Sequence, residues 1–116
     1  MTENLPDKLL VVWTCSDRDV ALNMVLMYVQ NAQRNEWWKQ VTLLIWGPSQ
    51  ELLLHDVEIG EKLTEMRQDG VRLIACRACA DKYGIADDLT SRGIEVFGTG
   101  PTLTEWLKSD SRVISF

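Results

Sequence analysis

Short apolar runs alternate with longer amphipathic segments along the whole chain. Residues 8–14 and 41–46 are mostly apolar at successive positions, which is typical of strands buried on both faces of a parallel sheet. The same pattern predicts further strands over residues 71–75, 94–97 and 112–116. Segments with helical character separate these runs, so the pattern predicts a mostly parallel sheet with helices on both faces.

The longest predicted helix covers residues 17–34 and is apolar around most of its circumference. A helix of this kind must pack on the sheet and on something else, for which a second subunit is a candidate. Residues 49–69 form a second helical segment that we expect to be interrupted near His55 and Asp56. A shorter helix is predicted over residues 85–92.

Two pairs of residues have the spacing of a capping box, in which a hydroxyl residue starts a helix. They are Ser16 with Asp19, and Thr102 with Glu105. Each pair predicts the first turn of a helix. We therefore expect one α/β domain over residues 1–116, with a three-layer α/β/α fold and a mostly parallel five-stranded sheet.

Composition and charge exclude several classes of function. The net charge of −5 argues against nucleic acids and acidic membranes as partners, because both require a basic surface. Residues 1–8 are polar and do not resemble a signal peptide, and no apolar stretch is long enough to span a bilayer. We expect a cytoplasmic protein. The five tryptophans are many for so short a chain, and they either lie in a subunit interface or line the edge of the core.

The clearest candidate for chemistry is Cys76, which follows the predicted strand over residues 71–75 and precedes a helix-like segment. The start of a helix presents unpaired N–H groups and a partial positive charge, and both stabilise a thiolate. Arg77 adds a full charge beside it. The sequence therefore predicts a reactive cysteine of low pKa, in an exposed and electropositive turn.

Other polar or aromatic residues follow the same ends of the predicted strands, where ligands collect in open parallel sheets. The binding candidates at this rim are Cys15, Ser16, Asp17, Trp46, Gly47, Arg77 and Cys79. Cys76 and Cys79 form a CxxC motif, which indicates a dithiol redox pair at some helix starts. For Cys79 we favour the alternative of a small buried residue, since free cysteines are commonly buried.

A zinc site is not expected, although Cys15, Cys76, Cys79 and His55 are a possible set of ligands. The second half-motif that identifies such a site is missing. His55 has no recognisable Ser or Cys partner, so a hydrolytic triad is not supported. Residues 98–101 (GTGP) match no phosphate-binding motif and indicate a turn. We expect no metal and no organic cofactor.

Three segments together resemble the DsrE/DsrF-like (YchN-like) family, small α/β proteins that include subunits of sulfur relays. They are KLLVVWTCSDRDVALNMVLMY, VTLLIWGPS and VRLIACRACADKYGI. The resemblance spans essentially the whole chain and implies a homo-oligomer, possible as a trimer or hexamer. In the sulfur-relay members, the cysteine after the third strand accepts a persulfide sulfur and passes it on, and Cys76 occupies the matching position.

The leading hypothesis is therefore a sulfur-relay protein, with sulfurtransferase as its candidate activity, that carries sulfur as a persulfide on Cys76. Its partners would be a sulfur donor protein and an acceptor protein. One alternative is a non-catalytic regulatory module that holds a small ligand or a protein at the rim with its tryptophans. A second alternative is a dithiol oxidoreductase that uses Cys76 and Cys79.

Overall fold

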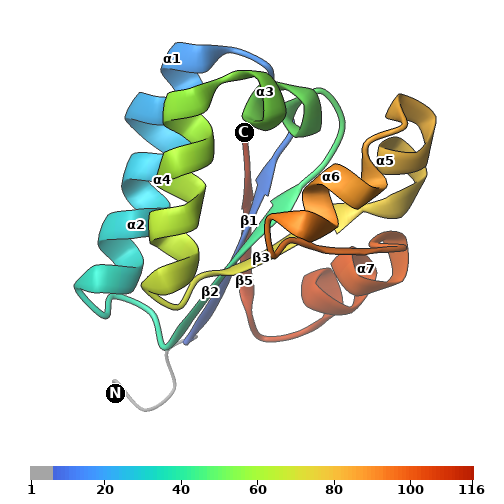
Figure 1. Ribbon diagram of the computed structural model, residues 1–116. Helices are drawn as coiled ribbons and strands as arrows, with labels where there is room; N and C mark the ends of the chain where they lie inside the picture. Colours follow the sequence, from blue (N-terminus) through green and yellow to red (C-terminus); the bar gives the residue numbers. More distant parts are fainter. Residues whose placement is uncertain (1–6) are drawn as a thin grey trace, which may run out of the picture.

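The computed structural model describes residues 7–116. Five strands form a sheet in the order β4-β3-β2-β1-β5 (Figure 1). All neighbouring strands are parallel, so the predicted five-stranded sheet is confirmed. The strands are β1 (Lys8–Trp13), β2 (Gln40–Ile45), β3 (Arg72–Cys76), β4 (Glu95–Phe97) and β5 (Arg112–Ser115).

Helical segments connect the strands. They are α1 (Arg18–Val20), the π-helical η2 (Ala21–Leu26), α2 (Met27–Arg34), α3 (Ser49–His55), α4 (Val57–Gln68), α5 (Arg77–Tyr83), α6 (Ala86–Ser91) and α7 (Gly100–Lys108). The first three follow one another without a break, so the helix predicted over residues 17–34 is present with a π-helical middle. The predicted interruption is confirmed, because Asp56 caps α4 by accepting a hydrogen bond from the Ile59 N–H.

Both predicted capping boxes are wrong. Asp17 caps the first helix in place of Ser16, because its carboxylate accepts a hydrogen bond from the Val20 N–H at 3.0 Å. Helix α7 begins at Gly100, ahead of Thr102, since the Thr99 carbonyl already accepts a hydrogen bond from Leu103 at 2.8 Å. The spacing rule found the right regions, but the path of the chain into each helix decides which oxygen reaches the free N–H groups.

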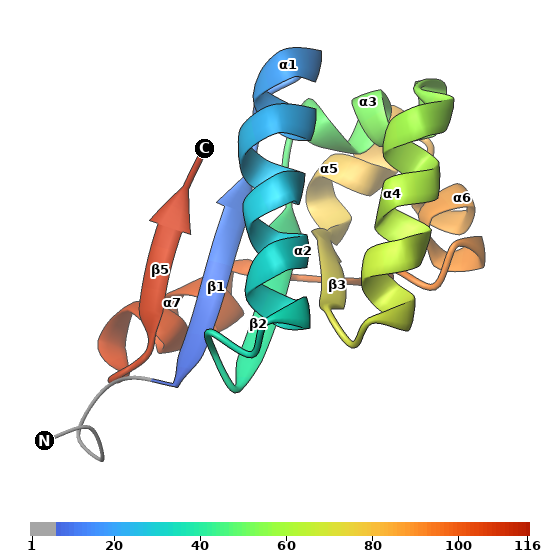
Figure 2. The same cartoon turned by 90° about the vertical axis from the view of Figure 1, so that its left-hand side faces the viewer.

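The two faces of the sheet are covered unequally. Helices α2 and α4 lie side by side over one face, and α7 lies on the other, which gives the three-layer α/β/α fold (Figures 1 and 2). The larger core lies under η2, α2 and α4. The smaller core lies under α7; its buried members are Leu10, Val12, Leu44 and Ile74, packed against Trp46, Phe97, Leu103, Trp106 and Val113.

Within residues 7–116, no helix is both long enough and apolar enough to cross a membrane. The expectation that residues 1–8 are not a signal peptide concerns mainly residues 1–6, which lie outside the described part of the chain.

Replacing Leu44 by alanine tests the smaller core. Leu44 is fully buried on the face that α7 covers. We expect Leu44→Ala to lower the free energy of unfolding by about 2–5 kcal/mol, because it removes buried methyl groups and leaves a cavity. Urea denaturation followed by tryptophan fluorescence measures the change. Leu107→Ala, at an exposed position of α7, is the control and should stay within about 0.5 kcal/mol of the wild type. Equal effects of the two substitutions would contradict the packing of α7 on the sheet.

Candidate functional site

Cys76 lies where β3 ends and α5 begins. It is the last residue of β3, pairs with Phe97 of β4, and is the N-cap residue of α5. The predicted strand-to-helix turn at this cysteine is therefore present. Side chains two residues apart in a strand point to the same face, so Cys76 shares the face of Ile74, which α7 covers. The Cys76 side chain thus faces the start of α7.

Four polar groups near the Cys76 thiol lower its pKa. They are the main-chain N–H groups of Ala78, Cys79 and Thr99, and the hydroxyl of Thr99. Burial raises the pKa of the Cys76 thiol because it penalises the charged form, whereas these donors lower it because they stabilise the thiolate. The donors outweigh burial, so the pKa of Cys76 lies below its ordinary value.

Cys76 is only 6% exposed, so the expectation of an exposed turn is wrong. The side chain is covered because it points toward α7 and the fully buried Thr99, which lies before the first residue of that helix. Arg77 and Ala78, which follow in the sequence, are exposed, and so is Gly98. The sulfur therefore lies close beneath the surface and is held by polar groups.

The charge expected beside the sulfur is directed elsewhere. The Arg77 guanidinium lies 3.5 Å from the Asp81 carboxylate and donates a hydrogen bond to the Val96 carbonyl at 3.3 Å. These contacts hold Arg77 along α5 and toward β4. The low pKa of Cys76 therefore depends on neutral donors, which the sequence predicted only in part.

Two residues of this site were missed by the sequence reasoning. Thr99 is fully buried, its hydroxyl has no hydrogen-bond partner among the described residues, and it lowers the pKa of the Cys76 thiol. The fully buried Gln50 donates hydrogen bonds to the carbonyls of Ile45 and Cys76, at 3.0 and 3.1 Å, and so joins the ends of β2 and β3. In the sequence, Thr99 lies between two glycines ahead of Pro101. This pattern was the only indication of a functional role for Thr99, but it also fits an ordinary turn.

Cys79 lies in the first turn of α5 and is partly exposed, so the favoured interpretation as a buried small residue is wrong. Its position is on the same side of the helix as Cys76, because residues three apart are neighbours on a helix surface. Cys76 and Cys79 are both free thiols, and so is Cys15.

The structure does not bring Cys15 to Cys76. Cys15 follows β1, and β2 lies between β1 and β3, which separates the two strand ends by about 10 Å. Ser16 and Asp17 follow Cys15 on the same connection, where Asp17 serves as a helix cap. Trp46 and Gly47 follow β2 and therefore lie between the two cysteines along the rim, with Trp46 packed on the smaller core.

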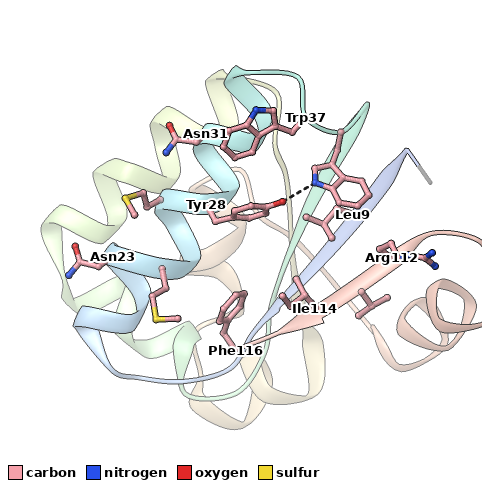
Figure 3. Close-up of a pocket in the computed structure, with 12 residues that line it drawn as sticks. Leu9, Asn23, Tyr28, Asn31, Trp37, Arg112, Ile114 and Phe116 are labelled. Carbon is pink, nitrogen blue, oxygen red and sulfur yellow. Dashed lines mark hydrogen bonds between the residues drawn. The ribbon is translucent and has the colours of Figure 1, made fainter. Parts of the chain in front are cut away.

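The tryptophans divide between core and surface. Trp13 is fully buried, whereas Trp46 and Trp106 pack at the edge of the smaller core. Trp37 and Trp38 lie away from the rim, in a groove of about 700 Å³ between the helix formed by η2 and α2 and the edge strand β5 (Figure 3). The lining residues are Leu9, Asn23, Met24, Met27, Tyr28, Asn31, Trp37, Trp38, Arg112, Val113, Ile114 and Phe116.

Aromatic contacts order the end of this groove. The rings of Tyr28 and Trp37 lie 5.8 Å apart at 42°, and the Trp38 indole N–H donates a hydrogen bond to the Tyr28 hydroxyl at 3.0 Å (Figure 3). Among the described residues, no Asp or Glu side chain lines the groove. Among residues 7–116, no three His, Cys, Asp or Glu side chains gather closely enough to hold a metal ion.

Comparison with known proteins agrees with this fold. The chain is similar to a conserved protein of unknown function from Bacteroides thetaiotaomicron, with 35% identity, a TM-score of 0.92 and coverage of 95% of both chains. It has the fold of the YchN protein from E. coli, with 16% identity, a TM-score of 0.71 and coverage of 97% of this chain and 100% of the other. No match is found among curated proteins. The model of the DsrE/DsrF-like family matches residues 19–116, and the chain belongs to this family.

Proposed function

We propose that this protein carries sulfur as a cysteine persulfide on Cys76. The observation that carries the proposal is the position of Cys76 at the start of α5, near the buried Thr99, whose unpartnered hydroxyl and three nearby N–H groups lower the pKa of the Cys76 thiol. A thiolate is the nucleophile in exchange between sulfur atoms, so a site that favours the ionised form favours this chemistry. Membership of the family that includes sulfur-relay subunits supports it.

The reaction needs no metal or organic cofactor. The Cys76 thiolate attacks the outer sulfur of a persulfide on the donor protein, a new S–S bond forms, and the donor cysteine leaves as a thiolate. The thiolate of an acceptor protein then attacks the outer sulfur held on Cys76 and releases the Cys76 thiolate. The donors that stabilise this thiolate also stabilise it as the leaving group, which favours the second step.

Loading with sulfur tests the proposal directly. After incubation with a small-molecule persulfide donor, we expect the intact mass of the wild-type chain to rise by one sulfur atom. Cys76→Ser should gain no sulfur, because its hydroxyl is not a nucleophile at neutral pH. Cys15→Ser is the matched control and should load like the wild type.

A wild-type chain that gains no sulfur, or a Cys76→Ser chain that loads normally, contradicts the carrier function. A wild-type chain that takes up no sulfur and reversibly loses two hydrogens favours the dithiol oxidoreductase.

Thr99→Val tests the source of the low pKa. Removing the hydroxyl removes one donor to the thiolate, so the pKa of Cys76 should rise. Alkylation of Cys76 at neutral pH should slow by roughly tenfold, because a hydrogen bond to a charged group contributes about 1.5–3 kcal/mol. Peptide-resolved mass spectrometry across a pH series measures this rate. Thr99→Ser keeps the hydroxyl and serves as the control. The Thr99 side chain makes no capping bond to α7, so the substitution leaves the helix start intact. Identical pH profiles for Thr99→Val and the wild type would refute this role.

We also propose that a second copy of the chain covers the groove beside β5. Its walls carry exposed apolar side chains, among them Met27 at 53%, Trp37 at 57% and Ile114 at 45%. Among the described strands, β5 pairs only with β1, so its outer edge is open to another strand (Figure 2). The chain has a net charge of −5, and a surface without described Asp or Glu side chains is where two copies meet with little repulsion.

Light scattering after size exclusion tests this association. The wild type should be a homo-oligomer, and the count decides between a dimer, a trimer and a hexamer. Ile114→Lys should lower the mass to that of the monomer, because it places a charge in a dry apolar contact. Leu107→Lys alters an apolar residue that is 64% exposed on α7, outside the groove, and should leave the mass unchanged. A monomeric wild type, or an Ile114→Lys variant of unchanged mass, excludes the groove as an interface.

A further inference from the structure

Cys79 is the thiol nearest in sequence to the proposed persulfide, and local geometry brings it close. Cys79 follows Cys76 by three residues in the first turn of α5, and its main-chain N–H is among the groups that lower the pKa of the Cys76 thiol. The two residues take the N-cap and third helical positions of α5, so they are neighbours on one side of the helix. A CxxC pair at a helix start is the spacing at which thiol–disulfide oxidoreductases form their disulfide.

The two thiols differ in exposure. Cys76 is 6% exposed and is covered by the start of α7, whereas Cys79 is partly exposed. An outside nucleophile therefore has little access to the inner sulfur of a persulfide on Cys76. A thiolate at position 79 needs no such access, because it is already part of the same turn. An internal reaction has the advantage of a high effective concentration.

The surroundings of Cys76 include a second element in addition to the start of α5. Thr99 is the N-cap residue of α7, a different element; it is fully buried, and its hydroxyl has no hydrogen-bond partner among the described residues. Thr99 thus lies on the α7 side of Cys76, and Cys79 lies on the α5 side. The outer sulfur of a persulfide must then occupy the remaining direction.

We propose that Cys79 is a resolving thiol that releases the carried sulfur as hydrosulfide, an activity that rests on the proposed persulfide at Cys76. The Cys79 thiolate attacks the inner sulfur and forms a Cys76–Cys79 disulfide. The bond between the inner and outer sulfur breaks, and its electron pair leaves with the outer sulfur as HS⁻. The outer sulfur is reduced, the Cys79 sulfur is oxidised, and the inner sulfur of Cys76 keeps its oxidation state, while the proton of Cys79 passes to solvent.

The disulfide must be reduced before the next cycle. An external dithiol supplies the two electrons, and the more exposed Cys79 sulfur is the atom it attacks. Cys76 then leaves as the thiolate that its four donors stabilise, which is the favourable direction for the exchange. The same turn thus serves both for holding sulfur and for discharging it when no acceptor protein is bound.

The test follows the full chain after loading with a small-molecule persulfide donor and removal of excess reagent. We expect the wild type to lose the added sulfur with time, to release an equivalent amount of hydrosulfide, and to end two hydrogens lighter than the reduced chain. Cys79→Ser should load equally but retain its sulfur and release none. Cys15→Ser is the matched control and should discharge like the wild type. A dithiol should restore the mass of the reduced wild-type chain.

The outcomes separate this inference from the carrier function. If the wild type loads and keeps its sulfur as long as Cys79→Ser does, the resolving role is refuted and the carrier function stands. If Cys15→Ser retains the sulfur and Cys79→Ser does not, the resolving thiol is misassigned. If the added sulfur migrates to Cys79 without release of hydrosulfide, as peptide mapping would detect, the attack is on the outer sulfur and the inference is wrong. If the wild type never loads, both proposals fail.

Discussion

An ionised sulfur beneath a protein surface depends on donors that replace the water it has lost. At Cys76 burial opposes the thiolate and hydrogen bonding favours it, and hydrogen bonding prevails. The donors come from two elements, the first turn of α5 and Thr99 ahead of α7. The state of the sulfur is therefore set by how α7 docks on the sheet. Gln50 also constrains the main chain of Cys76, because its side-chain amide donates hydrogen bonds to the carbonyls of Cys76 and of Ile45 at the end of β2.

The unequal layers of the fold separate two kinds of surface. The smaller core lies under α7 and includes Ile74 of β3. The Cys76 site lies at the end of the same strand, close to solvent. The larger core lies under η2, α2 and α4, and the helix formed by η2 and α2 borders the apolar groove beside β5 (Figure 3). The sulfur site and the groove lie on opposite sides of β1 and β2 in the strand order. An oligomer formed through the groove would leave the sulfur site open to partners.

Much of the fold was predictable because it depends on local patterns. The apolar runs of the strands, the helix of residues 17–34 and the break at Asp56 follow from periodicity and from a capping side chain, which act within a few residues. The cap positions were less predictable. The first helix is capped by Asp17 and not by Ser16, and α7 starts at Gly100, ahead of Thr102. Both differences reflect how the chain enters each helix. At 16% identity the chain still shares the fold of the YchN protein from E. coli.

The sequence by itself determined the parallel α/β fold and the position of Cys76 at a strand-to-helix turn, because both follow from residues that are neighbours in the chain. Only the tertiary structure decided that Cys76 is nearly closed off, that the buried Thr99 lies near it, and that β2 separates it from Cys15. It also placed Trp37 and Trp38 in the groove beside β5. These features depend on strand order and on the docking of α7, and contacts between residues distant in the chain leave no local pattern.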